Sequence, residues 1–436
     1  MLNRWFFKRI DNSPLIVFRI VFGLLLIAQA WGSIFTGFVG RLLKADFTFN
    51  FIGFDFIQPL PSIWMYVFYA VMGCFGVGVT LGYKYKFSIG GFTLMWTWVY
   101  LMQKIHYNNH YYLLILLCVF MWIAPAHRYY SLDTKRNPAL KKISMPRWIS
   151  LFIIVQMGMV YIFGAIAKIY PDWLDGTVGH ILMASKAHYP IIGKLLQEHW
   201  AIMVLTYFGL FFDLLITPLM LWKHTRNTAF VFAIFFHLFN SVVFQIGIFP
   251  YLALGLFIFF FPTKTVHDKL LKKKTYYSKN EVILPNHRRL VLSFLSIWFL
   301  VQLFLPLRHW FIKGDVLWTE EGHRLSWRMM LRTRRGISTF KVVNKKTGET
   351  TYIDKSRYLT GKQISATATK PDVIWQFCQR LKKEYAAKGE DIAIYVQAWV
   401  SVNGHKSELL INPSVDMAQA RWDYFFHNDW LLPKKW

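Results

Sequence analysis

Long apolar runs, separated by short polar segments, dominate residues 1–307. Runs of roughly 17 to 25 apolar residues are long enough to cross the hydrocarbon core of a bilayer as helices. One stretch is too long for a single span, and Gly247 with Pro250 supplies a break that divides it into a helical hairpin. The pattern predicts about nine transmembrane helices, at residues 14–35, 62–81, 88–103, 111–126, 148–167, 201–222, 228–245, 248–261 and 290–307.

The pattern of hydrophobic positions changes after residue 307, where the chain becomes more polar. Alternating apolar and polar positions predict one β-hairpin in STFKVVNKKTGETTYID and a second in DIAIYVQAWVSVNGHKSELLI, which turns at Asn403 and Gly404. A helical segment at 372–388 lies between them. We therefore expect an α-helical polytopic membrane protein, with a transmembrane domain at residues 1–307 and a small β-rich (α+β) domain at residues 308–436.

Charge predicts the orientation of this protein. The formal net charge of +27 would suggest nucleic acid in a soluble protein, but 55% of the residues are hydrophobic. The lysines and arginines cluster between the apolar runs, as they do in cytoplasmic loops. The basic segments 84–86, 128–147, 223–226 and 264–289 all fall on the cytoplasmic side if the N-terminus is cytoplasmic. We therefore expect an extracytoplasmic β-rich domain, contact with membrane lipid and no nucleic-acid partner.

Targeting signals and cysteines add little to this picture. The basic start leads into an apolar run without a small-residue cleavage site, and no Asn-X-Ser/Thr sequon occurs. These features favour a bacterial inner membrane. Cys74, Cys118 and Cys378 show no CxxC and no metal-site spacing, so we expect no metal centre.

Lys168 is the most informative residue of the chain, because it ends the apolar run in MVYIFGAIAKIYPDWLDG. An ionisable residue at the edge of a span often marks function, although terminal lysines also extend to the interface simply to stay hydrated. Aromatic neighbours such as Tyr161 and Trp173 could desolvate the amine, and desolvation favours the neutral form, a usable base. The residues alone allow both a catalytic base and an interfacial lysine.

Other polar residues interrupt the apolar runs. His237 and Asn240 lie three positions apart and so project from one helical face, either toward a cavity or into an interhelical hydrogen bond. His110 begins a span and could be a polar anchor or a functional group. No nucleotide-binding, hydrolase or metalloprotease motif occurs. Scattered His, Asn and Lys among aromatics suit a flat apolar cofactor such as a quinone.

Several segments give the chain a specific resemblance. They are, in order, QPLPSIWMYVFYAVMG, WVYLMQKIHYNNHYYL, YIFGAIAKIYPDWLDG, FFHLFNSVVFQIGIFPY, FLPLRHWF, LSWRMMLRTR, IYVQAWVSVNG and NPSVDMAQARW. Together they resemble the vitamin K-dependent γ-glutamyl carboxylase family, with its HTTM-type membrane domain, from about residue 12 to residue 430. The resemblance points to a short bacterial homologue. Animal members often carry a second lysine where this chain has Ala167, and the cysteines of their disulfide are missing here.

The resemblance implies two coupled reactions. Reduced vitamin K, a phylloquinol or menaquinol, is oxygenated with O2 to its epoxide, and CO2 is added to glutamate side chains of a protein or peptide substrate. Lys168 corresponds to the base that deprotonates the quinol, and His110 to a histidine of the carboxylation step. The residues expected at the cofactor are His237, Asn240, Ser241, Asn109 and Tyr161. The residues expected at the peptide substrate are Trp327, Arg332 and Arg334.

Two alternatives stand beside this interpretation. A homologue could keep quinol oxygenation and lose glutamate carboxylation. A non-enzymatic membrane binding or transport protein could use His237 and Asn240 as part of a solute path. Against transport, no pair of Gly/Pro-broken spans related by an inverted repeat occurs in the sequence.

Overall fold

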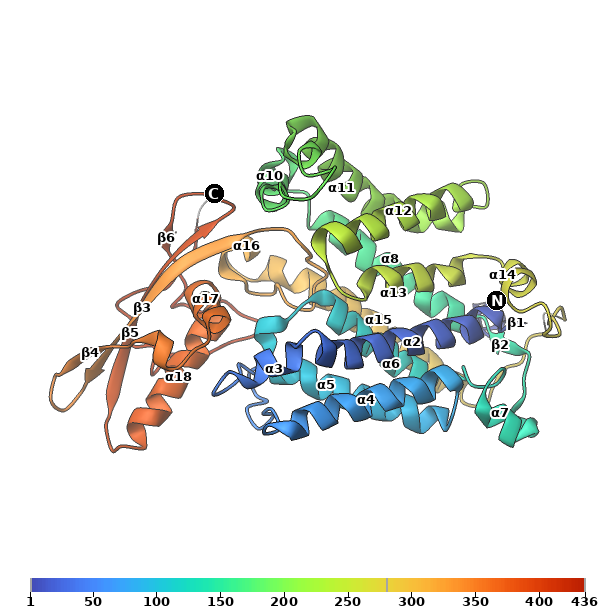
Figure 1. Ribbon diagram of the computed structural model, residues 1–436, viewed down its shortest axis with the longest axis horizontal. Helices are drawn as coiled ribbons and strands as arrows, with labels where there is room; N and C mark the ends of the chain where they lie inside the picture. Colours follow the sequence, from blue (N-terminus) through green and yellow to red (C-terminus); the bar gives the residue numbers. More distant parts are fainter. Residues whose placement is uncertain (1, 280, 435–436) are drawn as a thin grey trace.

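The structure is a computed structural model, and it describes residues 2–279 and 281–434. Figure 1 shows a helical part that holds the N-terminus and a sheet-containing part at the opposite end of the molecule. The long helices of the first part are α2 (Ser13–Phe35), α4 (Ile63–Leu81), α5 (Tyr85–Met102), α6 (Asn109–Ile123), α8 (Trp148–Ile166), α11 (His199–Leu221), α12 (Arg226–Phe244) and α15 (Arg288–Leu307).

Shorter elements connect these helices. The short α-helices are α1 (Leu2–Phe6), α3 (Phe38–Leu43), α7 (Leu132–Arg136), α9 (Pro171–Leu174), α10 (Thr177–Ala184), α13 (Phe249–Leu256) and α14 (Thr263–Leu270). The 3-10 helices are η1 (Lys104–His106), η2 (Pro138–Leu140), η3 (Leu195–Gln197) and η4 (Phe257–Phe260). Strands β1 (Arg9–Asp11) and β2 (Ser144–Pro146) pair antiparallel and join the start of α2 to the start of α8.

Every predicted span is helical, but the count of nine spans is not confirmed. Among the described residues, six helices are long and apolar enough to cross a membrane: α2, α4, α8, α11, α12 and the helix that continues α15 to Phe311. The segment from Phe249 to Leu270 would be a seventh, but it bends by 116°. Helix α6 has only 15 residues, and α5 carries Lys86 and several polar aromatic side chains.

The predicted break between the seventh and eighth segments is confirmed. Helix α12 ends at Phe244, and Gln245 and Gly247 adopt left-handed φ angles of 51° and 67° before α13 begins at Phe249. Glycine takes such angles without steric cost, whereas a side chain there is strained. The chain therefore reverses here, and α12 and α13 lie side by side (Figure 1).

The second part contains a four-stranded antiparallel sheet in the order β4-β3-β5-β6. Strands β3 (Arg334–Asn344) and β5 (Ile392–Val402) pair along their whole length, from Arg334 opposite Val402 to Asn344 opposite Ile392. The predicted hairpins are confirmed by β4 (Thr350–Tyr352) and β6 (Glu408–Leu409). The remaining helices are η5 (Arg308–Phe311), α16 (Val316–Thr319), η6 (Lys355–Arg357), α17 (Gly361–Thr369) and α18 (Pro371–Ala386).

Helices α17 and α18 cover one face of this sheet (Figure 1). Apolar side chains of α18, such as Phe377, pack against alternating buried positions of β5, such as Val396. Phe49 and Ile105, from loops of the helical part, join the same apolar core. The two parts therefore share a packed interface, and the candidate site lies beside it.

Candidate functional site

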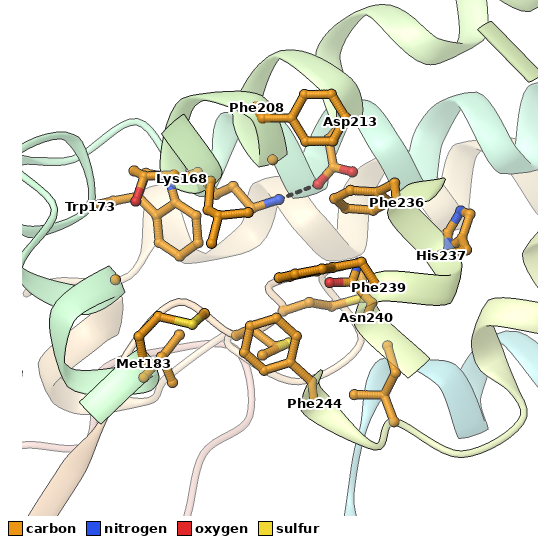
Figure 2. Close-up of a pocket in the computed structure, with 18 of the residues that line it drawn as sticks. Lys168, Trp173, Met183, Phe208, Asp213, Phe236, His237, Phe239, Asn240 and Phe244 are labelled. Atoms are coloured by element: carbon orange, nitrogen blue, oxygen red, sulfur yellow. Dashed lines mark hydrogen bonds and ion pairs between the residues drawn. The ribbon is translucent and has the colours of Figure 1, made fainter. Parts of the chain in front are cut away.

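An apolar cavity of about 130 Å³ lies between the ends of α8, α11, α12 and α13. Most of its walls are aromatic and aliphatic side chains, among them Phe208, Phe236, Phe239 and Phe244 (Figure 2). An apolar cavity of roughly 150 Å³ holds an aromatic ring the size of benzene. The cavity is thus shaped for a flat apolar group, and its few polar side chains determine what chemistry it can perform.

Lys168 follows the last turn of α8 and lines this cavity. Its Nζ forms an ion pair with Oδ2 of Asp213 from the middle of α11, and the two side chains are only 10% and 7% exposed. Figure 2 shows the two side chains pointing toward each other across the cavity wall. The Lys168 Nζ also lies 5.6 Å from the centroid of the Trp173 ring. The lysine is therefore held in the cavity rather than extended into solvent.

His237 and Asn240 line the same cavity, as their three-residue spacing predicts. His237 is fully buried, and its Nε2 lies 2.9 Å from the hydroxyl of Tyr161, which also lines the cavity. His110 begins α6 and stacks on Phe249 with ring centroids 3.9 Å apart. The Nδ1 atoms of His110 and His237 are buried and have no hydrogen-bond partner among the described residues. Such atoms are costly unless a ligand satisfies them.

A second, polar cavity of about 660 Å³ lies between the helical part and the sheet-containing part. It shares His110, Ile246, Met329 and Met330 with the apolar cavity, so the two cavities adjoin. Cationic side chains dominate its lining, with Glu320 as the one carboxylate among the described lining residues. The cations are Arg324, Arg328, Arg332, Arg334, Lys362 and Lys370. We call this the basic cavity.

Some of these cations are neutralised by carboxylates. Arg332 forms an ion pair with Glu320, and Arg334 Nε lies 3.6 Å from the same carboxylate. Arg324 pairs with Asp372 of α18 at 2.5 Å, and Lys104 pairs with it at 2.7 Å. Burial alone would raise the pKa of the Asp372 carboxyl, but Arg324 and Lys104 lower it to about 2.

Three cations of the basic cavity have no carboxylate ion-pair partner among the described residues, Arg328, Lys362 and Lys370, although the Nζ of Lys362 lies 2.9 Å from Nδ1 of His106. Burial, with a smaller contribution from Arg324, lowers the pKa of Lys370 to about 8. Burial and the neighbouring Arg332 lower the pKa of Arg328 to about 10. Desolvated cations without a direct ion-pair partner attract an anion, and a carboxylate is the natural ligand for an arginine.

The segment 325–331 forms the wall between the two cavities. Leu325, Trp327 and Met330 have left-handed φ angles of 62°, 58° and 51°. Such angles cost about 1–3 kcal/mol each and cluster at functional sites. Three side chains of the helical part hold this wall in place. Tyr107 accepts from Leu325 N at 2.6 Å, Asn109 donates to Arg328 O at 2.8 Å, and Tyr170 donates to Leu331 O.

Three sequence-predicted residues do not line the cavity where they were expected: Asn109 and Ser241 are not at the apolar cavity, and Trp327, expected at the peptide substrate, lines neither cavity. Asn109 lines the basic cavity, and its amide is engaged by Tyr107 and by Arg328 O. Trp327 is fully buried and stacks on Tyr112 with centroids 5.1 Å apart. Ser241 donates to the hydroxyl of Tyr251 at 3.1 Å. These positions suit residues that support the cavity walls.

The sequence marks Asp213 only weakly, and it does not single out Arg328 or Lys370. The signal for Asp213 was present, since it is a lone carboxylate inside the apolar run 201–222. Arg328 belongs to the same SWRMMLRTR segment as Arg332 and Arg334. Which of these arginines has a carboxylate partner depends on tertiary contacts, and no local pattern reveals it.

Two models of known families match the chain. Residues 7–264 match the family model described as HTTM domain. Residues 287–436 match the model described as vitamin K-dependent gamma-carboxylase, lumenal domain, and this match begins just before α15. No solved structure gave a significant match to the chain. The two matches together cover nearly the whole chain, and the chain belongs to the vitamin K-dependent gamma-carboxylase family.

Proposed function

We propose that this protein is a vitamin K-dependent carboxylase that couples oxygenation of reduced vitamin K to addition of CO2 at glutamate side chains. The observation that carries the proposal is the meeting of two unlike cavities. The first cavity is apolar and contains a lysine. The second cavity is basic and borders the sheet-containing part. A quinol and an acidic peptide need these two environments next to each other.

The lining of the apolar cavity suits the head group of a reduced naphthoquinone such as phylloquinol or menaquinol. Its aromatic walls exclude water, and the orphaned Nδ1 atoms of His110 and His237 offer hydrogen bonds to quinol oxygens. Lys168 stands on the same wall and accepts the proton of a quinol hydroxyl. When bound, the quinol and O2 supply a base far stronger than any side chain, which the γ-hydrogen of a glutamate requires. A dry cavity keeps water from quenching that base.

The basic cavity suits the glutamate side chain of a peptide. Arg328 and Lys370 can hold its carboxylate, because both are cationic and lack a carboxylate partner among the described residues. Arg332 and Arg334 are turned toward Glu320, so they shape the cavity and keep it positive. His110 borders both cavities and is the side chain best placed to act between the quinol and the glutamate.

The apolar helices make this an integral membrane protein. We propose that the membrane is a bacterial inner membrane with a cytoplasmic N-terminus. The transmembrane domain then comprises residues 1–307, and the outer domain, residues 308–436, faces the extracytoplasmic side. This orientation leaves the basic loops on the cytoplasmic side, beside anionic lipid.

The test is a coupled assay of the purified protein in detergent. Reduced vitamin K, labelled bicarbonate and a glutamate-rich peptide are supplied, and epoxide and fixed label are both measured. We expect both products from the wild type. Lys168→Ala should reduce both by about 10²- to 10⁴-fold, which is the usual contribution of a general base. Lys84→Ala, on the loop before α5, is the matched control.

The outcomes separate the candidate functions. Epoxide without fixed label would favour a quinol-oxygenating enzyme that does not carboxylate. Absence of both products with every quinol and peptide tried would overturn the proposal and favour a binding or transport protein. Equal activity of the wild type and Lys168→Ala would exclude this lysine as the base.

A further inference from the structure

Asp213 is a carboxylate in the middle of a membrane-spanning helix. It lies in α11, five residues before Pro218, and its side chain is 7% exposed. A charge in such a place is expensive and is kept only for a function or a partner. Among the described residues, the ion-pair partner of Asp213 is Lys168. The other described residues that line the cavity are mostly aromatic and aliphatic, and none of them is a second carboxylate, lysine or arginine.

The surrounding helices are shaped to bring the two groups together. A methyl group at Gly164 would lie 3.3 Å from Oδ2 of Asp213, so the absence of a side chain there leaves room for the carboxylate beside α8. Lys168 leaves the end of the same helix and points back into the cavity (Figure 2). The carboxylate thus reaches the lysine from a neighbouring helix and fixes its Nζ on the cavity wall.

A lysine paired in this way is not a free base. A carboxylate in contact with an ammonium favours the protonated lysine, and a protonated lysine cannot accept a further proton. Its partner, the Asp213 carboxylate, is a basic group in contact with the ammonium, so it can accept a proton from it. The pair as a whole can therefore take up one proton, with the lysine as its entry point and the aspartate as its final holder.

We propose that Asp213 is the positioning residue of Lys168 and the second half of a two-residue base. This inference rests on the proposed function and adds to it a named proton acceptor. In the resting state Asp213 is a carboxylate and holds Lys168 as an ammonium at the cavity wall. During the reaction Lys168 takes the proton of the quinol hydroxyl and passes one of its own protons to Asp213.

The proton transfer balances without another reactant. The O–H bond of the quinol hydroxyl breaks and a new N–H bond forms on Lys168 Nζ. One other N–H bond of Lys168 breaks, and an O–H bond forms on the Asp213 carboxyl group. The lysine stays cationic beside the oxygen that has become negative, so the net charge of the cavity is zero before and after the transfer. No oxidation occurs in this step.

The first test measures the protonation of Lys168 in the absence of any quinol. The protein is treated with acetic anhydride across a range of pH, and acetylation of Lys168 is quantified by mass spectrometry. Acetylation requires the neutral amine. We expect Asp213→Asn to move the midpoint of labelling about 1 to 3 pH units lower, which is the usual effect of removing an opposite charge in contact. Asp213→Glu, which keeps the carboxylate, should restore labelling close to that of the wild type.

A second lysine–aspartate pair supplies the matched control. Asp11 and Lys274 form a buried pair at 2.5 Å, with both side chains fully covered. Asp11 lies in β1, beside the start of α8, whereas Lys168 follows its end. The length of α8 separates the two pairs by roughly 28 Å. Asp11→Asn should therefore leave the labelling midpoint of Lys168 unchanged.

Activity provides the second readout. We expect Asp213→Asn to lower epoxide formation about 10- to 100-fold, because the neutral Lys168 of this variant is a weaker base and is no longer fixed at the cavity wall by an ion pair. On the acidic side of its pH profile, the rate of epoxide formation by Asp213→Asn should rise at lower pH than in the wild type. This shift should parallel the shift of the labelling midpoint. Loss of activity with an unmoved limb and an unmoved midpoint would show a purely structural role and overturn the proposal.

Failure of this inference differs from failure of the proposed function. A shifted labelling midpoint in a protein that makes no epoxide would remove the proposed function and leave the proton-sharing pair intact. If Asp213→Asn does not fold, infrared difference spectra of the wild type replace it. Anaerobic addition of reduced vitamin K should then produce the band of a protonated carboxyl group that responds to isotopic labelling of aspartate, and absence of that band would overturn the proposal.

Discussion

The two cavities use the same kinds of charged side chain in opposite ways. In the apolar cavity a single cation, Lys168, meets a single carboxylate, and the pair has no net charge. In the basic cavity cations outnumber carboxylates, and Arg328 and Lys370 have no carboxylate partner among the described residues. A neutral dry cavity suits an uncharged quinol, whereas an excess of positive charge suits an anionic peptide.

This difference shows that the ligand a cavity can bind depends less on how many charged side chains it has than on which of them have a partner of opposite charge. Both cavities border the segment 325–331, so one short wall separates a site for proton transfer from a site for anion binding. His110 and Met329 border both sides of that wall. Changing the charge balance on either side should therefore affect one half of the reaction more than the other.

The largest effect should come from the carboxylate that anchors the basic cavity. Asp372 pairs with both Lys104 and Arg324, and so ties α18 to the helical part. Breaking a buried pair by removing one partner costs about 3–5 kcal/mol. We expect Asp372→Asn to lower the thermal unfolding midpoint strongly, as followed by intrinsic tryptophan fluorescence. Asp391→Asn, whose carboxylate is 64% exposed, should change the midpoint little.

The pH dependence of this contribution has a defined sign. The pKa of Asp372 in the folded protein, about 2, is below its ordinary value of 3.8. The stabilisation is therefore complete above about 3.8 and is lost as the pH falls toward about 2. Asp372→Asn should lack this part of the acid destabilisation. An identical pH dependence in wild type and variant would show that Asp372 does not anchor the outer part.

The second largest effect should come from Arg328. A hydrogen bond to a charged group contributes about 1.5–3 kcal/mol. Arg328→Ala should therefore raise the KM for a glutamate peptide about 10- to 100-fold while the KM for the quinol changes little. Arg335→Ala, an exposed arginine on β3, is the control. Equal changes in both KM values would contradict the separation of the two cavities.

The fold was largely predictable from periodicity. Helices, hairpins and the break near Gly247 follow from local patterns, because apolar runs and strand alternation need no knowledge of the partner surface. The number of spans was not, because α6 is too short and α5 too polar to cross a bilayer by length and composition alone. Neighbouring helices, rather than the sequence of each, determine where such segments lie.

The candidate site was predictable only in part. Lys168, His237 and Asn240 interrupt apolar runs, and that local contrast singled them out before they were found at one cavity. The role of Asn109 depends on Arg328 O, more than 200 residues away in the chain. Pairing over such separations leaves no local signal in the sequence. Only the folded protein therefore distinguishes the arginines that have a carboxylate partner from those that have none among the described residues.

A smaller effect should follow from the titration of Lys370. Its pKa of about 8 places the loss of its charge within the range of ordinary assays. The KM for the peptide should rise about fourfold between pH 7 and pH 8.5 as the ammonium is lost. Lys370→Arg stays protonated and should flatten this rise. Lys104, whose pKa is also about 8 because of burial, titrates in both proteins, so the comparison isolates Lys370. A rise that persists in Lys370→Arg would remove Lys370 from the peptide site.

The smallest effects distinguish two neighbours on α12. Asn240 lines the apolar cavity, whereas the hydroxyl of Ser241 is bonded to Tyr251. An ordinary hydrogen bond contributes about 0.5–1.5 kcal/mol, so Asn240→Ala should raise the KM for the quinol about 2- to 10-fold. Ser241→Ala should change it less than about twofold, because only a bond within the hairpin is lost. Initial rates at varied quinol and saturating peptide measure both. A larger effect of Ser241→Ala would place the quinol near the turn between α12 and α13 rather than in the cavity that Lys168 lines. The apolar cavity would then not be the quinol site, and the contrast between the two cavities would not explain the two halves of the reaction.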